Sequence, residues 1–96
     1  MVNLEEIKSA LRDHKSELEE RFKVKRIAIF GSYAREEEAN TSDVDILVDL
    51  YEPIGLEIID LKEFLEEILG IEVDLVTIKA LRPELSEIIL KEAIYA

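Results

Sequence analysis

The sequence predicts an α/β fold in which a small mixed β-sheet is flanked by helices. Three short apolar runs of strand length alternate with longer segments whose apolar residues recur at helical spacing. Glycine and proline fall at the ends of these segments, where they terminate or open helices. The 96 residues leave room for one hydrophobic core, so we expect residues 1–96 to form a single domain.

A first amphipathic helix is expected from Asn3 to about Glu20. Asn3, with Glu6 three residues later, fits the start of a capped helix. His14 falls on the polar side, and we interpret it as a surface residue with no ligand role. The apolar stripe of this helix consists of Leu4, Ile7, Leu11 and Leu18.

The next segments predict a strand, a short helix and a loop. Val24 to Phe30 is nearly continuously apolar at its end, as in a strand that is buried on both faces. The strand stops at Gly31. Ser32 to Glu38 has the composition of a helix with Ser32 as N-cap, and Ala39 to Ser42 is a polar loop.

The second half repeats the alternation of strand and helix. Asp43 to Leu50 predicts a strand, and Pro53 opens a helix that ends at Gly70. Ile71 to Ile78 predicts a third strand. Pro83 to Tyr95 predicts a last helix.

The composition excludes several classes of protein. Cysteine is absent, which rules out disulfides, thiolate metal sites and thiol catalysis. No apolar run approaches the roughly 18–20 residues that span a membrane, and the N-terminus lacks a signal-peptide pattern, so we expect a cytoplasmic protein without membrane contact. The net charge of −11 opposes direct binding of nucleic acid, which depends on lysine and arginine.

The turn after the first strand is a candidate anion site. Gly31 allows a tight turn and close approach of the backbone to a ligand, and the following N–H groups can bind an anion. The Ser32 hydroxyl adds a further donor. A glycine that ends a strand is common, so this feature alone predicts little.

Carboxylates on the second and third strands are candidate metal ligands. Asp43 and Asp45 project to the same side, because residues two apart on a strand share a face. Two such carboxylates repel each other unless a cation compensates, and Mg²⁺ favours one or two carboxylates together with phosphate oxygens. We interpret Asp49, which has the same parity, as a solvated strand end. On the third strand, Asp74 interrupts an apolar run, with Glu72 as the rival candidate.

An anion-binding turn beside two or three carboxylates is suited to phosphoryl or nucleotidyl transfer by two metal ions. Gly31-Ser32, ten further residues and Asp43-x-Asp45 resemble the signature of the polymerase-β-like nucleotidyltransferase superfamily. The string from Gly31 to Arg35, with the string from Ser42 to Val48, is similar to the minimal nucleotidyltransferases (MNTs). The likeness extends over nearly the whole chain, to the Glu92-Ala93 ending of the last helix, and implies a polymerase-β palm-like fold.

The resemblance implies a role for each matching position. Gly31 and Ser32 would hold the β- and γ-phosphates of ATP. Asp43 and Asp45 would ligate two Mg²⁺ ions, and Asp74 would be the third carboxylate, which helps to activate the acceptor hydroxyl.

Arg35 matches a position that is usually arginine, and it would approach the triphosphate or orient the acceptor. Here Glu36 follows it, where glycine is common, and Glu37 and Glu38 extend an acidic loop. Negative charge at this point works against ATP binding.

The resemblance also implies a partner. Members of the MNT group are antitoxins that are paired with a HEPN-domain ribonuclease toxin and that transfer AMP from ATP to a tyrosine of that toxin. A chain without a substrate domain fits a protein acceptor. Ile94 and Tyr95 are candidates for the contact, or for packing at the helix end.

Two other functions remain open. The protein could be an antitoxin that neutralises its toxin by binding alone, which the acidic run Glu36 to Glu38 favours. It could also transfer a nucleotide to a small molecule, and the lack of a substrate domain counts against this function.

Overall fold

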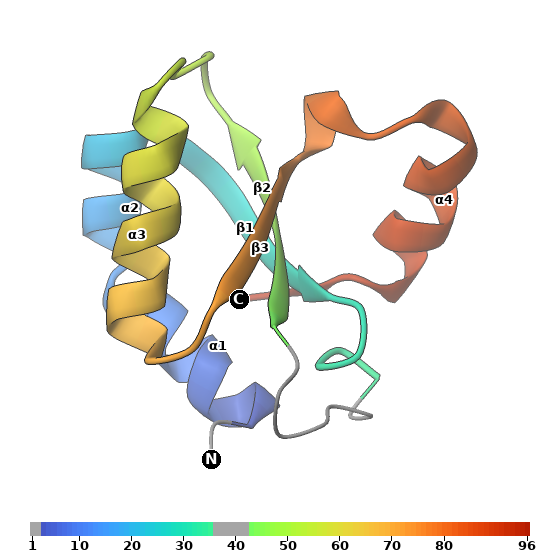
Figure 1. Cartoon of the computed structure of the whole chain (residues 1–96), viewed down its shortest axis with the longest axis horizontal. Helices are drawn as coiled ribbons and strands as arrows, with labels where there is room; N and C mark the ends of the chain where they lie inside the picture. The colour runs from blue at the N-terminus through green and yellow to red at the C-terminus, as the bar shows by residue number, and fades with distance from the viewer. Residues whose placement is uncertain (1–2, 36–42) are drawn as a thin grey trace.

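The computed structural model describes residues 3–35 and 43–96 and shows a four-stranded sheet with helices on both faces (Figure 1). The strand order is β3-β2-β1-β4. β1 is antiparallel to β2 and β4, and β2 is parallel to β3, which confirms the predicted small mixed sheet. The strands are β1 (Val24–Phe30), β2 (Val44–Leu50), β3 (Val73–Thr77) and β4 (Ile94–Tyr95).

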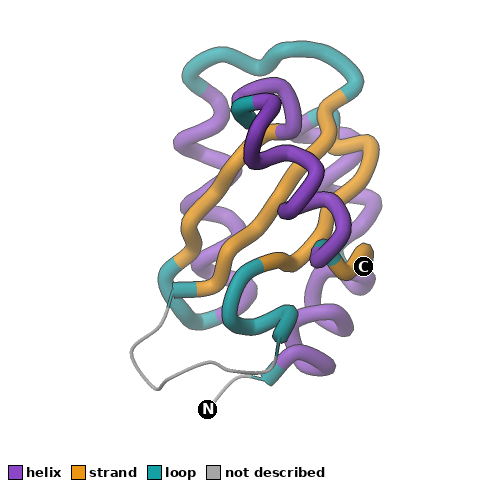
Figure 2. Tube along the Cα trace, turned by 90° about the vertical axis from the view of Figure 1, so that its right-hand side faces the viewer, coloured by secondary structure: helices purple, strands orange, loops and turns teal. Residues whose placement is uncertain are grey.

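The helices divide unequally between the two faces. α1 (Leu4–Asp13), α2 (Lys15–Phe22) and α3 (Glu57–Leu69) cover one face, and α4 (Pro83–Glu92) lies on the other. The short 3₁₀ helix η1 (Ile78–Ala80) leads from β3 into α4. Figure 2, viewed from the α4 side, shows one helix in front of the strands and the others behind them.

The hydrophobic core lies between the sheet and α1, α2 and α3. In contrast, α4 buries none of its residues, and Leu85 and Ile88 on it are exposed. The part of the chain that is described contains no helix long and apolar enough to cross a membrane. The largest fully buried side chains are Ile7, Leu11, Leu18, Ile29, Val44, Ile46, Leu47, Val48, Leu61, Leu65 and Val73.

The first helical segment is two helices, not the single helix that the sequence predicts. His14 caps the end of α1 and the start of α2 with φ −107° and ψ 16°, outside the helical range. Its ring is half-buried at the break, with Nδ1 2.9 Å from the Ala10 carbonyl oxygen and an edge-on contact to Phe64 at 5.8 Å. The interpretation of His14 as a surface residue is therefore wrong. The cap at Asn3 is confirmed, because its Oδ1 accepts the Glu6 N–H at 2.9 Å.

The helix expected from Pro53 begins only at Glu57. A turn precedes it, in which Gly55 takes φ +57° and the Glu57 N–H donates to the Ile54 carbonyl. Leu56 lies outside the helix and is 84% exposed. The predicted end at Gly70 is confirmed, with φ +71°.

Two further expectations need correction. The last helix stops at Glu92, and the two residues of β4, Ile94 and Tyr95, pair with β1 instead of continuing the helix. The described part of the expected helix Ser32 to Glu38 is a single turn, closed by the Arg35 N–H on the Gly31 carbonyl at 3.1 Å. The remainder of that helix and the loop Ala39 to Ser42 lie outside the described residues.

Candidate functional site

Three neighbouring strands bring the predicted residues to one end of the sheet. In the antiparallel pair, Phe30 at the end of β1 lies opposite Asp45 near the start of β2. In the parallel pair, Asp45 lies opposite Asp74 on β3. The turn at Gly31 therefore begins beside the two carboxylates, although 14 and 29 residues of sequence separate Asp45 from Gly31 and Asp74.

The Asp45 and Asp74 side chains come from paired residues of neighbouring strands and interact with each other. Burial raises the pKa of Asp45 from 3.8 to about 6, and Asp74, Asp43 and Glu92 add to the increase. The structure thus gathers three further carboxyl groups around Asp45, of which Glu92 is paired with Arg35 at 2.8 Å.

Asp43 and Asp74 occupy the exposed margin of this cluster. Asp43 directly precedes β2, and its charge contributes to the raised pKa of Asp45. Of the two candidates on the third strand, Asp74 lies opposite Asp45. The rival Glu72 precedes β3, and its carbonyl oxygen accepts the Val44 N–H at 3.0 Å.

The Gly31 turn requires glycine for two reasons. Its φ of +73° is in the left-handed region, which other residues rarely adopt. In addition, a Cβ at position 31 would overlap the Asp45 carboxylate. Half-buried Ser32 follows, and Tyr33, which is 4% exposed, anchors the turn in the hydrophobic core.

One residue of the site, Glu92, has no role predicted from the sequence. Its Oε1 accepts the Gly31 N–H at 2.6 Å and a hydrogen bond from Arg35 Nη1 at 2.8 Å. Glu92 is the last residue of α4, where a negative charge is unfavourable because the helix dipole is negative there. That misplaced charge and the Glu92-Ala93 ending, which resembles the minimal nucleotidyltransferases, are signals in the sequence that could have drawn attention to Glu92.

The donor set fits a hard divalent cation only in part. Within residues 3–35 and 43–96, no three histidine, cysteine, aspartate or glutamate side chains are arranged to hold a metal ion on their own. Asp45 nevertheless offers a partly buried carboxylate next to Asp74 and Asp43, and Mg²⁺ commonly binds one or two carboxylates plus phosphate oxygens and water. The residues therefore fit magnesium that shares its coordination with a nucleotide.

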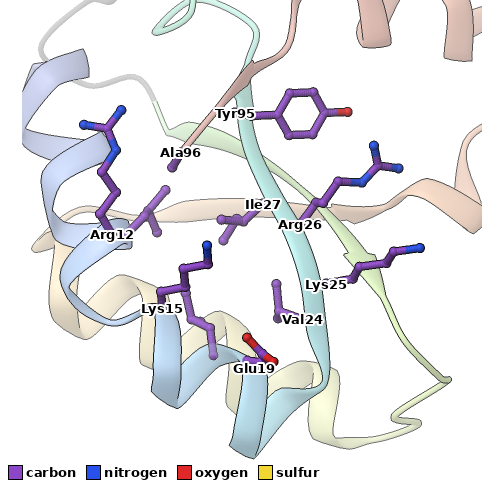
Figure 3. A pocket seen from close by; sticks show the side chains of 11 residues that line it. Arg12, Lys15, Glu19, Val24, Lys25, Arg26, Ile27, Tyr95 and Ala96 are labelled. Atoms are coloured by element: carbon purple, nitrogen blue, oxygen red, sulfur yellow. The ribbon is translucent and has the colours of Figure 1, made fainter.

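Two surface hollows lie away from the carboxylates. A pocket of about 250 Å³ lies between α1, α2 and β1, and Arg12, Lys15, Lys25 and Arg26 contribute to its wall (Figure 3). The other hollow is more apolar and lies between the far end of β2 and η1. Asp49, at that end of β2, is an ion-pair partner of Arg26 at 2.9 Å, and its side chain is 19% exposed. The interpretation of Asp49 as a solvated strand end is therefore wrong.

The fold and the site together define a nucleotidyltransferase. The profile described as "Nucleotidyltransferase domain" matches residues 11–96, and the chain belongs to this family. The chain is 53% identical to "Putative protein adenylyltransferase MJ1217" of Methanocaldococcus jannaschii, over 99% of each protein. It is 50% identical to "Protein adenylyltransferase MntA" of Thermococcus cleftensis, over 99% of this chain and 97% of that protein. The prediction of an enzyme that transfers a nucleotidyl group is confirmed.

Solved structures narrow the family to the minimal nucleotidyltransferases, as the sequence predicts. The chain superimposes with a TM-score of 0.81 on one described as a "putative minimal nucleotidyltransferase", at 39% identity over 97% of this chain and 95% of the other. A toxin–antitoxin complex with AMP-PNP matches at 25% identity and a TM-score of 0.71, over 98% of this chain and 72% of that chain.

A third structure shares the fold at lower identity. It is a complex of the tri-AMPylated Shewanella oneidensis HEPN toxin with MNT antitoxin, at 21% identity and a TM-score of 0.67, over 93% of this chain and 70% of that chain. At this identity the likeness concerns the fold.

Proposed function

We propose that this protein transfers AMP from ATP to a tyrosine hydroxyl of a HEPN-domain toxin and thereby acts as its antitoxin. The observation that carries the proposal is the pair formed by Asp45 and Asp74 beside the Gly31 turn. Carboxylates of the kind that bind Mg²⁺ and backbone donors of the kind that bind phosphate lie together at this end of the sheet, which supports the proposal. Relatives named protein adenylyltransferases, and a similarly folded MNT antitoxin bound to an AMPylated toxin, support it.

In this proposal each residue of the site has one task. The Gly31 N–H and Ser32 bind the β- and γ-phosphates of ATP, and Arg35 adds a positive charge. Asp43, Asp45 and Asp74 would hold two magnesium ions. Bound magnesium would lower the pKa of the attacking hydroxyl and neutralise charge on the leaving pyrophosphate.

At the α-phosphorus the reaction forms one bond and breaks one bond, and one proton is transferred from the tyrosine hydroxyl. The tyrosine oxygen attacks the α-phosphorus, the bond to the β-phosphate oxygen breaks, and pyrophosphate leaves. The hydroxyl proton passes to a carboxylate, for which exposed Asp74 is the candidate. The net charge of −11 supports a protein acceptor over a nucleic acid.

Mass spectrometry of the toxin tests the proposal. The product of the neighbouring gene is incubated with this protein, ATP and magnesium, and we expect it to gain one or more AMP units on a tyrosine. Asp45→Asn should abolish the gain. Asp49→Asn, on the same strand but in the ion pair with Arg26, is the matched control and should retain it. Transfer that survives in Asp45→Asn would refute the proposed site.

A second candidate is an antitoxin that acts by binding alone. The specific observation in its favour is that the Gly31 N–H and the Arg35 guanidinium, both assigned to ATP, are engaged by Glu92. For this candidate, the Asp45→Asn variant would still neutralise the toxin in a growth assay, and the toxin would show no added mass. Loss of neutralisation in that variant excludes it.

A further inference from the structure

The Glu92 carboxylate lies at the point where a phosphate oxygen would be bound. A single oxygen, Oε1, accepts the Gly31 N–H at 2.6 Å and the Arg35 Nη1 hydrogen bond at 2.8 Å. A backbone N–H of a glycine turn and a guanidinium are the donors that proteins use for phosphate oxygens. Glu92 thus presents an anionic oxygen of its own chain to a donor pair that suits a nucleotide.

A triphosphate oxygen and Glu92 cannot both take the Gly31 N–H at the same time. The Gly31 N–H has one hydrogen to donate, and it is already used at short distance. Glu92 also adds a charge to a cluster that holds Asp43, Asp45 and Asp74, and it is among the groups that raise the pKa of Asp45. A triphosphate that arrived with Glu92 in place would meet this additional repulsion.

The helix that carries Glu92 has few buried contacts with the rest of the protein. α4 buries none of its side chains, and the chain is held again only after it, where Ile94 and Tyr95 pair with β1 and the Ala96 N–H donates to the Ile27 carbonyl at 3.1 Å. Segments with few buried contacts open locally at low free energy. Withdrawal of Glu92 therefore needs no disruption of the core between the sheet and α1, α2 and α3.

We propose that Glu92 closes the triphosphate site in the nucleotide-free protein, and that a phosphate oxygen of the nucleotide displaces its carboxylate and loosens the C-terminal end of α4. This inference rests on the proposed function, because it takes Gly31 and Arg35 as phosphate donors. It makes Glu92 a residue that sets nucleotide affinity, without a part in the chemical step.

Calorimetric titration with a non-hydrolysable ATP analogue and magnesium tests whether the nucleotide displaces the Glu92 carboxylate. Glu92→Gln removes the competing charge and Glu92→Ala removes the whole carboxylate, so both should bind the analogue about tenfold more tightly than the wild type. Glu87→Gln is the matched control, because it removes the same charge from an exposed position of α4 and should change the affinity little. Unchanged or weaker binding by both Glu92 variants overturns the inference, as does an equal gain in Glu87→Gln.

Hydrogen exchange provides a readout that does not depend on affinity. In the wild type, peptides within residues 83–96 should exchange faster when the analogue is bound, and in Glu92→Ala they should exchange fast from the start. Unchanged or slower exchange in the loaded wild type overturns the inference.

Failure of the inference and failure of the proposed function remain distinguishable. If no variant binds the analogue, both are wrong. If Glu92→Gln binds the analogue more tightly but no AMP reaches the toxin, the displacement of Glu92 by phosphate is supported and the proposed AMP transfer is wrong.

Discussion

Gly31 and the Asp45 carboxylate lie so close together that no side chain fits between them. Gly31 directly follows the first strand of the sheet and Asp45 stands near the start of the second, so their proximity follows from the antiparallel register of Phe30 and Asp45. The turn can approach the carboxylate because glycine has no Cβ and tolerates φ +73°.

Replacing Gly31 by alanine should therefore destabilise the protein and abolish AMP transfer. Positive φ alone costs roughly 1–2 kcal/mol for a residue with a Cβ, and the overlap with Asp45 adds to it. Gly70→Ala is the control for backbone strain, since Gly70 has φ +71° and open space around its Cβ position. In thermal melts, a loss in Gly31→Ala no larger than in Gly70→Ala would contradict the close approach.

Asp45→Asn should stabilise the metal- and nucleotide-free protein at pH 8. The pKa of Asp45 is raised to about 6 in the folded protein against an ordinary value of 3.8, so the folded state binds the proton more tightly than the unfolded chain. Stability of the wild type should then increase as the pH falls from above 6 towards 4, where Asp45 becomes protonated. Asparagine imitates the protonated form at every pH.

We expect a gain on the order of 1 kcal/mol at pH 8, after discounting for the partial exposure of the carboxylate, and no gain near pH 4. Urea unfolding at several pH values measures it. Asp49→Asn, which loses the contact with Arg26, should give no such gain. An Asp45→Asn variant less stable than the wild type at pH 8 would show that the carboxylates do not repel each other as described.

Magnesium together with a non-hydrolysable ATP analogue should raise the melting temperature. A ligand at 100 times its Kd stabilises the folded state by about 2.7 kcal/mol, which corresponds to roughly 10 °C or more for a domain of this size. Because the carboxylates would share the ion with phosphate, neither magnesium nor the nucleotide alone should reach this shift. A melting temperature indifferent to both ligands together would mean that the site binds no nucleotide.

The core beneath α3 should respond strongly to truncation. Leu61 is fully buried between α3 and the sheet, and Leu61→Ala should lower the free energy of unfolding by about 2–5 kcal/mol. Leu56→Ala removes the same atoms from a side chain that is 84% exposed and should change it by less than about 0.5 kcal/mol. Urea unfolding measures both changes. Similar losses of unfolding free energy in the two variants would contradict the burial of Leu61 in the core.

Sequence periodicity predicted the helices and strands that are long or continuously apolar. It failed where contacts with distant parts of the chain, such as pairing with another strand, determine the structure. The bounds of Val24–Phe30 were predicted correctly, because its apolar run has no helical alternative. The break at His14 was missed because Leu11 and Leu18 are seven residues apart, two helical turns, so the stripe continues across it. β4 was missed because two residues are too few to show a strand pattern. They form a strand only because they pair with β1.

For the candidate site, the types of residue could be predicted from the sequence, but which of them lie close together could be predicted only in part. Parity predicted that Asp43 and Asp45 share one side of the second strand. On the third strand, the choice between Asp74 and Glu72 depends on the register against Asp45, which no local pattern fixes. The contact of Glu92 with Gly31 spans 61 residues and requires the path of α4, which lies outside any local signal.

The parallel pairing of β2 and β3, which sets Asp45 beside Asp74, requires a crossover connection, and α3 is the helix in that connection. α3 is seated by Leu61, Leu65 and Leu69, all buried. A change of volume beneath α3 would shift the helix slightly, and because packed interiors transmit strain, the end of β3 that carries Asp74 would shift with it. Substitutions far from the carboxylates could therefore tune the spacing of the metal ligands without altering a single charged residue.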